Sequence, residues 1–218
     1  MRLLGREPRP SLALASMLAG VVVLLAAVTL GGFVGRLDLG LLAAVQAGAG
    51  EWATDGAVAI TMLGGTNATL LVTVLGCALL LILRHWRGAV ALAFSVVATN
   101  VVVNAVKLTV SRPRPDADEA LIQAGGFSFP SGHAAIAVAL YATLGYVLAR
   151  RCTGSVRAGV IAGTALVVAA VGMSRVYLGV HYPTDVLAGW LTGGAIVLAS
   201  WMLVARLGLP NRAAPTAA

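Results

Sequence analysis

Long uncharged stretches alternate with short polar segments along most of this chain. A helix needs about 20 apolar residues to cross a bilayer core of roughly 30 Å, and six stretches approach that length. They cover residues 11–34, 66–83, 88–106, 131–149, 158–173 and 183–205. The pattern therefore predicts an all-α integral membrane bundle of six transmembrane helices. We expect one domain over residues 1–218, with an ordered core at about 11–206 and flexible termini, including a frayed tail after Leu209.

The region before the second stretch differs from the others. Residues 11–34 follow three arginines but are longer than the apolar part of a signal peptide, and no small-residue cleavage site follows them, so we interpret them as a retained span. Between residues 37 and 65, Glu51 and Asp55 interrupt two apolar stretches that are too short to cross. These stretches predict short interfacial helices between the first and second spans.

The composition supports a membrane protein. Of 218 residues, 59% are hydrophobic and 11% are charged, whereas a soluble domain carries about 25% charged residues. These values exclude an ordinary cytosolic globule, a disordered chain and a nucleic-acid-binding protein. The net charge of +7 allows two explanations, a polyanionic partner or the basic bias of cytoplasmic loops.

The positions of the basic residues favour the second explanation. If both termini are cytoplasmic, ten of the 15 Lys and Arg residues lie on the inner side of the six spans, as the positive-inside rule requires. These ten are Arg2, Arg6, Arg9, Arg84, Arg87, Arg150, Arg151, Arg157, Arg206 and Arg212. We therefore expect a protein of the bacterial cell membrane with both termini cytoplasmic and no nucleic-acid partner.

The other five basic residues fall on the outer side, and four of them lie close to span ends. The five are Arg36, Lys107, Arg112, Arg114 and Arg175. Arginines at span ends usually extend to the interface as anchors, and we interpret Arg36 and Arg112 in this way. Lys107, Arg114 and Arg175 instead belong to polar segments that contain most of the unusual residues of the chain.

Three such segments, residues 107–115, 130–133 and 174–185, emerge on the same outer face by the parity of the spans. Lys107, Arg114 and Arg175 offer three positive charges whose donors match phosphate oxygens. The segment Pro130-Ser131-Gly132 opens a helix, whose free N–H groups and dipole favour an anion. The three segments together predict a phosphate site at the outer boundary of the membrane.

Two histidines supply candidate chemistry for this site. Asp185 lies four residues after His181, across Pro183, so a helical first turn brings its carboxylate to the imidazole. A neutral imidazole oriented by a carboxylate can attack phosphorus. We assign His181 as the nucleophile, Asp185 as its orienting partner, and His133 as the acid that protonates the leaving oxygen and later activates water.

The sequence contains no set of His and carboxylate residues with metal-ligand spacing near these segments. Fixed cations can neutralise a phosphate where other phosphatases use metals. We therefore expect no metal and no cofactor. We interpret Asp116, Asp118 and Glu119 as a solvated acidic loop rather than a cation site.

The pattern Lys-x6-Arg-Pro, Pro-Ser-Gly-His and Ser-Arg-x5-His-x3-Asp resembles the three-part signature of the type 2 phosphatidic acid phosphatase superfamily. Its members include lipid phosphate phosphatases, undecaprenyl diphosphate phosphatases, glucose-6-phosphatase and vanadium-dependent haloperoxidases. The resemblance implies the same roles for His181, His133 and Asp185. It also implies that phosphate is bound by Lys107, Arg114, Ser131, Gly132, Ser174 and Arg175.

The predicted function is hydrolysis of the phosphomonoester or diphosphate headgroup of a lipid through a phosphohistidine. Undecaprenyl diphosphate is the first choice of substrate, with phosphatidic acid and phosphatidylglycerol phosphate close behind. We expect the bundle wall and residues 37–65 to select the lipid. The expected partners are this substrate and membrane lipids, and the oligomeric state is left open.

Two alternatives remain. A transporter or receptor could bind an anion or lipid phosphate without hydrolysis, but a transporter would place charges near mid-bilayer, where the uncharged stretches have none. A haloperoxidase-like activity would need vanadate in the phosphate pocket, and those enzymes resemble soluble proteins.

Two further patterns concern packing. Asn100, Asn104 and Lys107 form one stripe of a helix, for which interhelical hydrogen bonds are favoured and substrate contact is the alternative. Glycines recur at four-residue spacing in three pairs, which predicts close helix packing. The pairs are Gly31 and Gly35, Gly159 and Gly163, and Gly189 and Gly193.

Overall fold

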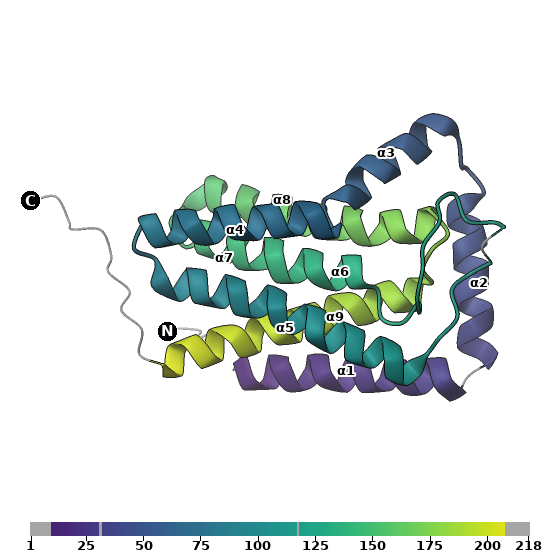
Figure 1. Cartoon of the computed structure of the whole chain (residues 1–218), viewed down its shortest axis with the longest axis horizontal. Coiled ribbons are helices and arrows are strands. Elements are labelled where there is room, and N and C mark those ends of the chain that lie inside the picture. Colours follow the sequence, from purple (N-terminus) through teal and green to yellow (C-terminus); the bar gives the residue numbers. More distant parts are fainter. Residues whose placement is uncertain (1–9, 31, 117, 208–218) are drawn as a thin grey trace, which may run out of the picture.

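The computed structural model describes residues 10–30, 32–116 and 118–207, and every regular element in these ranges is helical. Figure 1 shows their arrangement. Two predictions concern residues outside these ranges. They are the fraying after Leu209 and the packing of Gly31, the partner of Gly35 in its pair. The elements are α1 (Pro10–Leu30), α2 (Gly32–Gln46), α3 (Glu51–Met62), α4 (Thr66–Ile82), α5 (Trp86–Val110), α6 (Gly132–Ala137), the π-helical turn η1 (Val138–Ala142), α7 (Thr143–Ala149), α8 (Gly154–Tyr177) and α9 (Pro183–Arg206).

Four helices in the described ranges are long and apolar enough to cross a membrane. They are α5, the continuous helix Gly132–Ala149 formed by α6, η1 and α7, α8, and α9. The pair α3 and α4, bent by 43° at its break, qualifies as a fifth span if it is counted as one. The prediction of an all-α membrane bundle is confirmed. The number of six spans stays a prediction, because α4 has 17 residues and the apolar part of α1 covers only Ser11–Ala26. Both are shorter than the about 20 residues that a span usually needs.

The first predicted span differs from the structure at its end. The helix α1 ends at Leu30 and α2 begins at Gly32, so the apolar stretch that the sequence suggests for residues 11–34 is divided between two helices. Residues 37–65 do form helical structure in α2 and α3, as expected. Their position at an interface stays a prediction.

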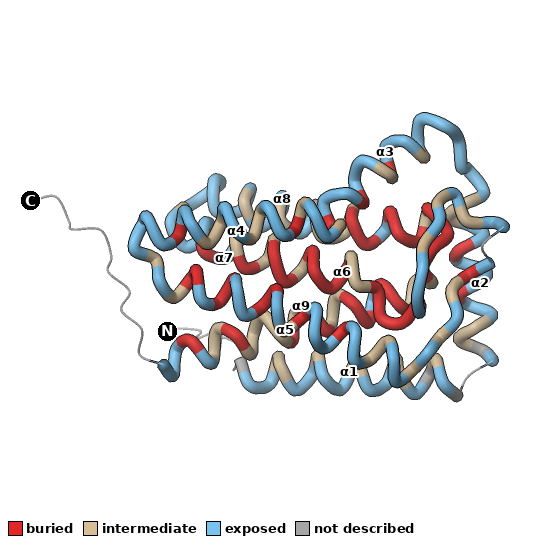
Figure 2. The backbone as a smooth tube through the Cα atoms, in the orientation of Figure 1, coloured by how far each residue is buried: buried red, intermediate tan, exposed pale blue. Residues whose placement is uncertain are grey.

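The long helices lie side by side, while α2 and α3 diverge from them at one end of the bundle (Figure 1). The helix α9 packs against α1, α5 and α6, and the buried hydroxyls of Ser95 and Ser200 join α5 to α9 at 2.9 Å. Buried positions concentrate in α6 and in the adjoining halves of α8 and α9 (Figure 2). Large apolar side chains such as Leu70, Val97 and Leu166 remain exposed, as suits helices that face lipid.

Close packing at glycine explains how α9 approaches α6. A Cβ atom at Gly189 would lie 2.6 Å from the carbonyl oxygen of Ser131, and one at Gly193 would lie 2.5 Å from that of Ala135. The packing predicted for this pair is confirmed. The prediction is wrong for Gly35, Gly159 and Gly163, where an added Cβ would meet nothing within 4 Å.

Candidate active site

The predicted site residues gather at the end of the bundle that carries α2 and α3. They come from the end of α5 and the loop after it, the start of α6, the end of α8, and the start of α9, with the turn between these last two. These segments lie side by side at one end in Figure 1. Residues far apart in the sequence, from Lys107 to Asp185, therefore share one neighbourhood.

His181 and Asp185 form a buried pair. Pro183 begins α9, and its first turn carries Asp185 so that the carboxylate Oδ2 lies 3.4 Å from His181 Nδ1. Ser128 Oγ donates a hydrogen bond to the same Oδ2 at 2.5 Å, and the backbone N–H of Tyr182 donates to it at 3.0 Å. The carboxylate is thus fixed from three sides against the imidazole.

The hydrogen bonds assign the tautomer of His181. Arg114 Nη1 lies 3.1 Å from His181 Nε2, and a guanidinium can only donate. Nε2 must then accept, so the ring proton lies on Nδ1, which faces Asp185 Oδ2 and, at 3.3 Å, Ser128 Oγ. The arrangement leaves the ring lone pair on Nε2, where it accepts from Arg114 on the cationic side of the site.

The charge state of His181 agrees with this tautomer. Burial lowers the pKa of the imidazole from 6.5 to about 4, although Asp185 opposes the shift, and the positive charges of Arg114 and Arg175 lower the pKa further. The ring is therefore neutral near pH 7. A neutral imidazole is the form that can act as a nucleophile.

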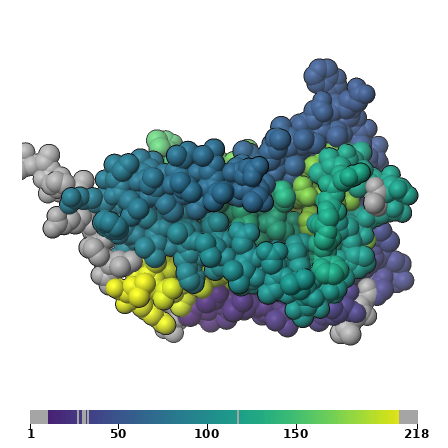
Figure 3. Space-filling view, in the orientation of Figure 1, coloured from purple at the N-terminus to yellow at the C-terminus, as the bar shows by residue number. Residues whose placement is uncertain are grey.

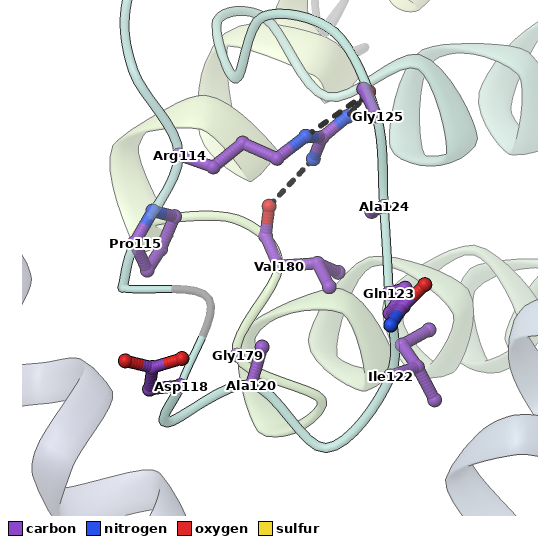
Figure 4. A pocket seen from close by; sticks show the side chains of 10 residues that line it. All are labelled: Arg114, Pro115, Asp118, Ala120, Ile122, Gln123, Ala124, Gly125, Gly179 and Val180. Carbon is purple, nitrogen blue, oxygen red and sulfur yellow. Dashed lines mark hydrogen bonds between the residues drawn. The ribbon is translucent and has the colours of Figure 1, made fainter.

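The three predicted phosphate-binding cations are held by backbone or hydroxyl oxygens. Arg114 donates to the carbonyl of Val180 at 2.6 Å and to that of Gly125 at 2.8 Å (Figure 4). Lys107 Nζ donates to the carbonyls of Phe127 and Ser128. Arg175 Nη1 donates to Thr61 Oγ1 at 2.8 Å. Three cations that are partly or fully buried make this end of the bundle strongly attractive to an anion.

Two buried polar atoms of the site have no hydrogen-bond partner within the described part of the chain. They are Arg175 Nε and Ser131 Oγ. Buried donors are normally satisfied, so a ligand with several acceptor oxygens suits them. Ser131 also precedes α6 directly, and its N–H donates to the carbonyl of Asp185 at 2.9 Å, which ties the start of α6 to α9.

The structure brings His133 and Gly132 to the same neighbourhood. Both line a groove with Lys107, and the positive charges of Arg175 and Arg114 act on the His133 ring at this range. Ser174 is buried in α8, but its hydroxyl donates to the carbonyl of Val171 in its own helix at 2.7 Å. Its phosphate-binding role therefore has no support from the geometry of its side chain.

Arg112 corrects one prediction. The sequence suggests a membrane anchor, but the guanidinium is only 12% exposed and bridges two carboxylates, Asp38 Oδ2 at 2.7 Å and Asp185 Oδ1 at 2.5 Å. Its Cζ also lies 4.1 Å from the centre of the Tyr182 ring. Arg112 thus belongs to the site, where it compensates the buried charge of Asp185. Arg36 is exposed, as an anchor would be.

Sequence reasoning missed three other contributors. Asp38 of α2 is 1% exposed and also accepts hydrogen bonds from the backbone and hydroxyl of Thr184. Ser128 and Thr61 bind Asp185 and Arg175 as described above. A carboxylate in an otherwise apolar stretch was the available signal for Asp38, whereas nothing in the sequence distinguishes Ser128 or Thr61 from ordinary surface hydroxyls.

The acidic loop after Pro115 has the character expected from its sequence. Asp116, Asp118 and Glu119 are exposed, and Asp116 Oδ1 accepts the N–H of Asp118 at 3.0 Å. Within the described residues, no group of three or more His, Cys, Asp or Glu side chains is arranged to hold a metal ion. Metal independence itself stays a prediction.

The fold and the site define a helical membrane protein with a cationic, histidine-containing pocket at one end. Residues 88–208 match the PAP2 superfamily, and the chain belongs to this family. The matched region includes every predicted site residue but neither Asp38 nor Thr61.

Three relatives illustrate the likeness. The chain is 35% identical over 148 residues to phosphatidylglycerophosphatase B of Bacillus subtilis (strain 168), covering 65% of this chain and 70% of that protein. It is 32% identical over 139 residues to lipid A 1-phosphatase of Rhizobium johnstonii, covering 60% of this chain and 53% of that protein. It is 37% identical over 109 residues to decaprenylphosphoryl-5-phosphoribose phosphatase of Mycolicibacterium smegmatis, covering 49% of this chain and 53% of that protein.

Two solved structures share the fold. The crystal structure of a transmembrane PAP2-type phosphatidylglycerolphosphate phosphatase from Bacillus subtilis aligns with a TM-score of 0.79 at 26% identity, covering 89% of this chain and 95% of that one. Aquifex aeolicus LpxE aligns with a TM-score of 0.59 at 24% identity, covering 78% of this chain and 95% of that one. The second likeness concerns the fold alone.

Proposed function

We propose that this protein is a membrane phosphatase that removes the headgroup phosphate of a lipid through a phosphohistidine on His181. The observation that carries the proposal is the buried, neutral His181 ring, with its proton directed at Asp185 and its Nε2 facing Arg114. This arrangement provides a nucleophile inside a cationic pocket. Membership of the PAP2 superfamily and phosphatases among the relatives support the same activity.

The reaction has two displacements. The Nε2 lone pair of His181 forms a bond to phosphorus and the bond from phosphorus to the lipid oxygen breaks. His133, whose protonated form is favoured by the negative charge of the bound phosphate, gives its proton to that oxygen. His133 then takes a proton from water, whose oxygen attacks phosphorus while the N–P bond breaks. The net reaction converts lipid phosphate and water into lipid alcohol and inorganic phosphate, and His133 ends protonated as it began.

The fixed cations stabilise the transferred group. Lys107, Arg114 and Arg175 can neutralise the charge on the three equatorial oxygens, which is the main requirement of phosphoryl transfer. The unpartnered Arg175 Nε and Ser131 Oγ add donors directed by the fold. With this charge supplied by side chains, we propose that turnover needs no metal ion.

We also propose a membrane arrangement of six spans, with both termini cytoplasmic and the site on the outer face. In this arrangement α1 forms the first span and α4 the second. The loops between α4 and α5 and between α7 and α8 lie at the end of the bundle opposite the site (Figure 1) and carry Arg84, Arg150 and Arg151. The positive-inside rule then assigns that end to the cytoplasm.

For the substrate, a glycerolipid phosphate such as phosphatidylglycerol phosphate now ranks ahead of undecaprenyl diphosphate, the first choice from the sequence. A sequence relative and a solved structure with 95% coverage of that chain are both phosphatases of phosphatidylglycerol phosphate. Lipid A and decaprenyl-linked substrates appear among the other relatives. All of these molecules carry a phosphate on a membrane lipid, which suits a site at a bundle end.

The test is phosphate release from a panel of lipid phosphates and diphosphates by the purified protein in detergent, with the His181→Ala variant beside it. Replacing the nucleophile should lower turnover by roughly 10³-fold or more and leave phosphate binding measurable, because the cations remain. His85→Ala, at the opposite end of the bundle, is the matched control and should retain turnover. Undiminished turnover in His181→Ala would show that the nucleophile is misassigned, and flux of lipid phosphate across vesicles without hydrolysis would favour a transporter instead.

A further inference from the structure

A groove of about 410 Å³ runs from the candidate site along the flank of the bundle. Lys107, Gly132 and His133 line the groove beside the site, and residues of α4 and α5 line its continuation. Figure 3 shows this hollow between the blue atoms of α4 and the teal atoms of α5. The polar residues of the continuation are Thr66, Thr69, Thr73, Asn100 and Asn104. A polar lining on a membrane-facing flank requires an explanation, because hydrocarbon cannot satisfy it.

The two asparagines do not make the interhelical hydrogen bonds that the sequence favours. Asn100 Nδ2 donates to the carbonyl of Val96 in its own helix at 3.1 Å. Asn104 makes no hydrogen bond within the described part of the chain, and both residues are exposed. The prediction of interhelical bonding is therefore wrong for this stripe. An amide without a partner in hydrocarbon is unfavourable, so the alternative, contact with a bound lipid, gains support.

The asparagine amides and the Thr66 hydroxyl are the available neutral donors of the groove's continuation. Thr69 Oγ1 donates to the carbonyl of Gly65 at 2.9 Å, and Thr73 Oγ1 donates to that of Thr69 at 2.6 Å. Their hydroxyl protons are thus used within α4. Asn104 has both amide protons available and Asn100 has one, so the groove presents donors suited to neutral acceptors such as carbonyl oxygens.

The asparagines lie at the depth where a glycerolipid carries its esters. Asn104 and Asn100 precede Lys107 by three and seven residues, which at about 1.5 Å per residue places them about 4.5 and 10.5 Å along α5 from it. If phosphate is bound beside Lys107, the acyl-ester carbonyls of a diacylglycerol phosphate, a few bonds from phosphorus, fall in this interval. A polyprenyl chain offers only hydrocarbon there beyond its phosphates.

We propose that Asn104 and Asn100 form a subsite for the acyl-ester linkage of a glycerolipid phosphate, and that this subsite makes the protein select ester-linked lipids. The proposal rests on the proposed function, because it assumes that the lipid phosphate occupies the site beside His181. It assigns the two asparagines to substrate binding and not to the chemical step.

A polyprenyl diphosphate makes the strongest competing ligand for the groove. Its second phosphate would reach the depth of Asn104, but Lys107 is the only Lys or Arg among the residues that line the groove. A second phosphate would therefore meet neutral amides, whereas buried anions are normally paired with cations. The lining matches ester carbonyls better than a further phosphate.

The experiment compares a diacyl glycerol phosphate with a dialkyl ether analogue of the same chain length, which lacks the carbonyls. The wild-type protein should favour the ester by about fivefold in kcat/KM, the discrimination expected of one neutral hydrogen bond. Asn104→Leu and the double variant Asn100→Leu/Asn104→Leu should reduce this ratio towards one. The ratio is taken within each variant, so loss of folded protein cancels. Asn67→Leu replaces an exposed asparagine of α4 outside the groove and should keep the ratio.

Binding of the same two lipids to the His181→Ala variant, with and without Asn104→Leu, tests the subsite without turnover. A preference for the ester that disappears with Asn104→Leu supports the subsite even if the wild-type protein hydrolyses no lipid, an outcome that would reject the proposed function alone. An ester-to-ether ratio that survives in the double variant overturns the subsite. If the double variant loses polyprenyl diphosphate hydrolysis but keeps the ester preference, the subsite is also overturned.

Discussion

At the scale of single residues, the pKa of His181 links its burial to its proposed chemistry. The ring should remain neutral down to about pH 4, compared with an ordinary value of 6.5. Replacing Asp185 by Asn should lower this pKa further, because the carboxylate favours the protonated imidazole. The measurement is an NMR titration of isotopically labelled histidine rings in detergent, with the His181 signal assigned by its loss in His181→Ala.

The same shift has a consequence for stability. The unfolded chain binds the His181 proton near pH 6.5 and the folded chain only near pH 4, so unfolding takes up a proton between these values and stability falls as the pH drops through that interval. A His181 ring that titrates at 6.5 or above would contradict both expectations. It would also remove the argument for a neutral nucleophile stabilised by burial.

Residue spacing predicted one part of the site and could not predict another. The relation between His181 and Asp185 is local, because four residues across Pro183 make one helical turn, and the structure contains this pair. Asp38 and Arg112 are 74 residues apart and join helices whose contact depends on the whole fold. No periodicity in the sequence connects them, so Arg112 resembled the many arginines that anchor span ends.

At the scale of elements, Arg112 fastens α2 to the start of α9 through Asp38 and Asp185. Replacing Arg112 by Gln should lower the free energy of unfolding by roughly 3 kcal/mol, because it leaves the fully buried Asp185 without this cation. The measurement is thermal unfolding of the purified variants in one detergent. Arg36→Gln is the matched control on an exposed arginine of α2 and should change stability by no more than about 0.5 kcal/mol. Equal melting of the two variants would mean that the bridge contributes nothing to the fold.

Glycine pairs show why element packing exceeds what a sequence pattern can predict. Gly159 and Gly163 have the same spacing as Gly189 and Gly193, but only the second pair contacts another backbone closely. Spacing fixes which residues share a helix face, whereas the direction in which that face points depends on the positions of all the helices. The π-helical turn η1 inside the span 132–149 was missed for a related reason, because its residues are as apolar as those around them.

At the scale of the whole molecule, hydrophobic runs located most of the long helices within a few residues. The predicted stretch 183–205 corresponds to α9 (Pro183–Arg206), and 131–149 to the helix Gly132–Ala149. The first stretch was less accurate, because the apolar residues continue past Leu30, whereas α1 ends there and α2 begins at Gly32. Hydropathy depends on composition, so it does not register a change of chain direction within an apolar run.

The separation of charge along the bundle predicts how the molecule lies in the membrane. Exposed Arg84, Arg150 and Arg151 lie at the end opposite the site, and exposed Glu51 and Asp55 lie on α3 at the site end. Basic loops are retained in the cytoplasm during insertion. We therefore expect the site end to face outward when the protein is expressed in bacterial cells.

Single cysteines introduced into a chain without Cys77 and Cys152 test this orientation. In intact cells, a membrane-impermeant maleimide should modify Ala53→Cys, on exposed α3, and leave Ser155→Cys, at the start of α8, unmodified until the cells are permeabilised. Both positions are exposed, so a difference between them reports sidedness and not burial. The reverse order of labelling would place the His181 pocket in the cytoplasm. The phosphatase would then act on lipid phosphates of the inner leaflet, and the excess of arginine at the other end would need a cause other than insertion, such as the anionic partner that the net charge of +7 first suggested.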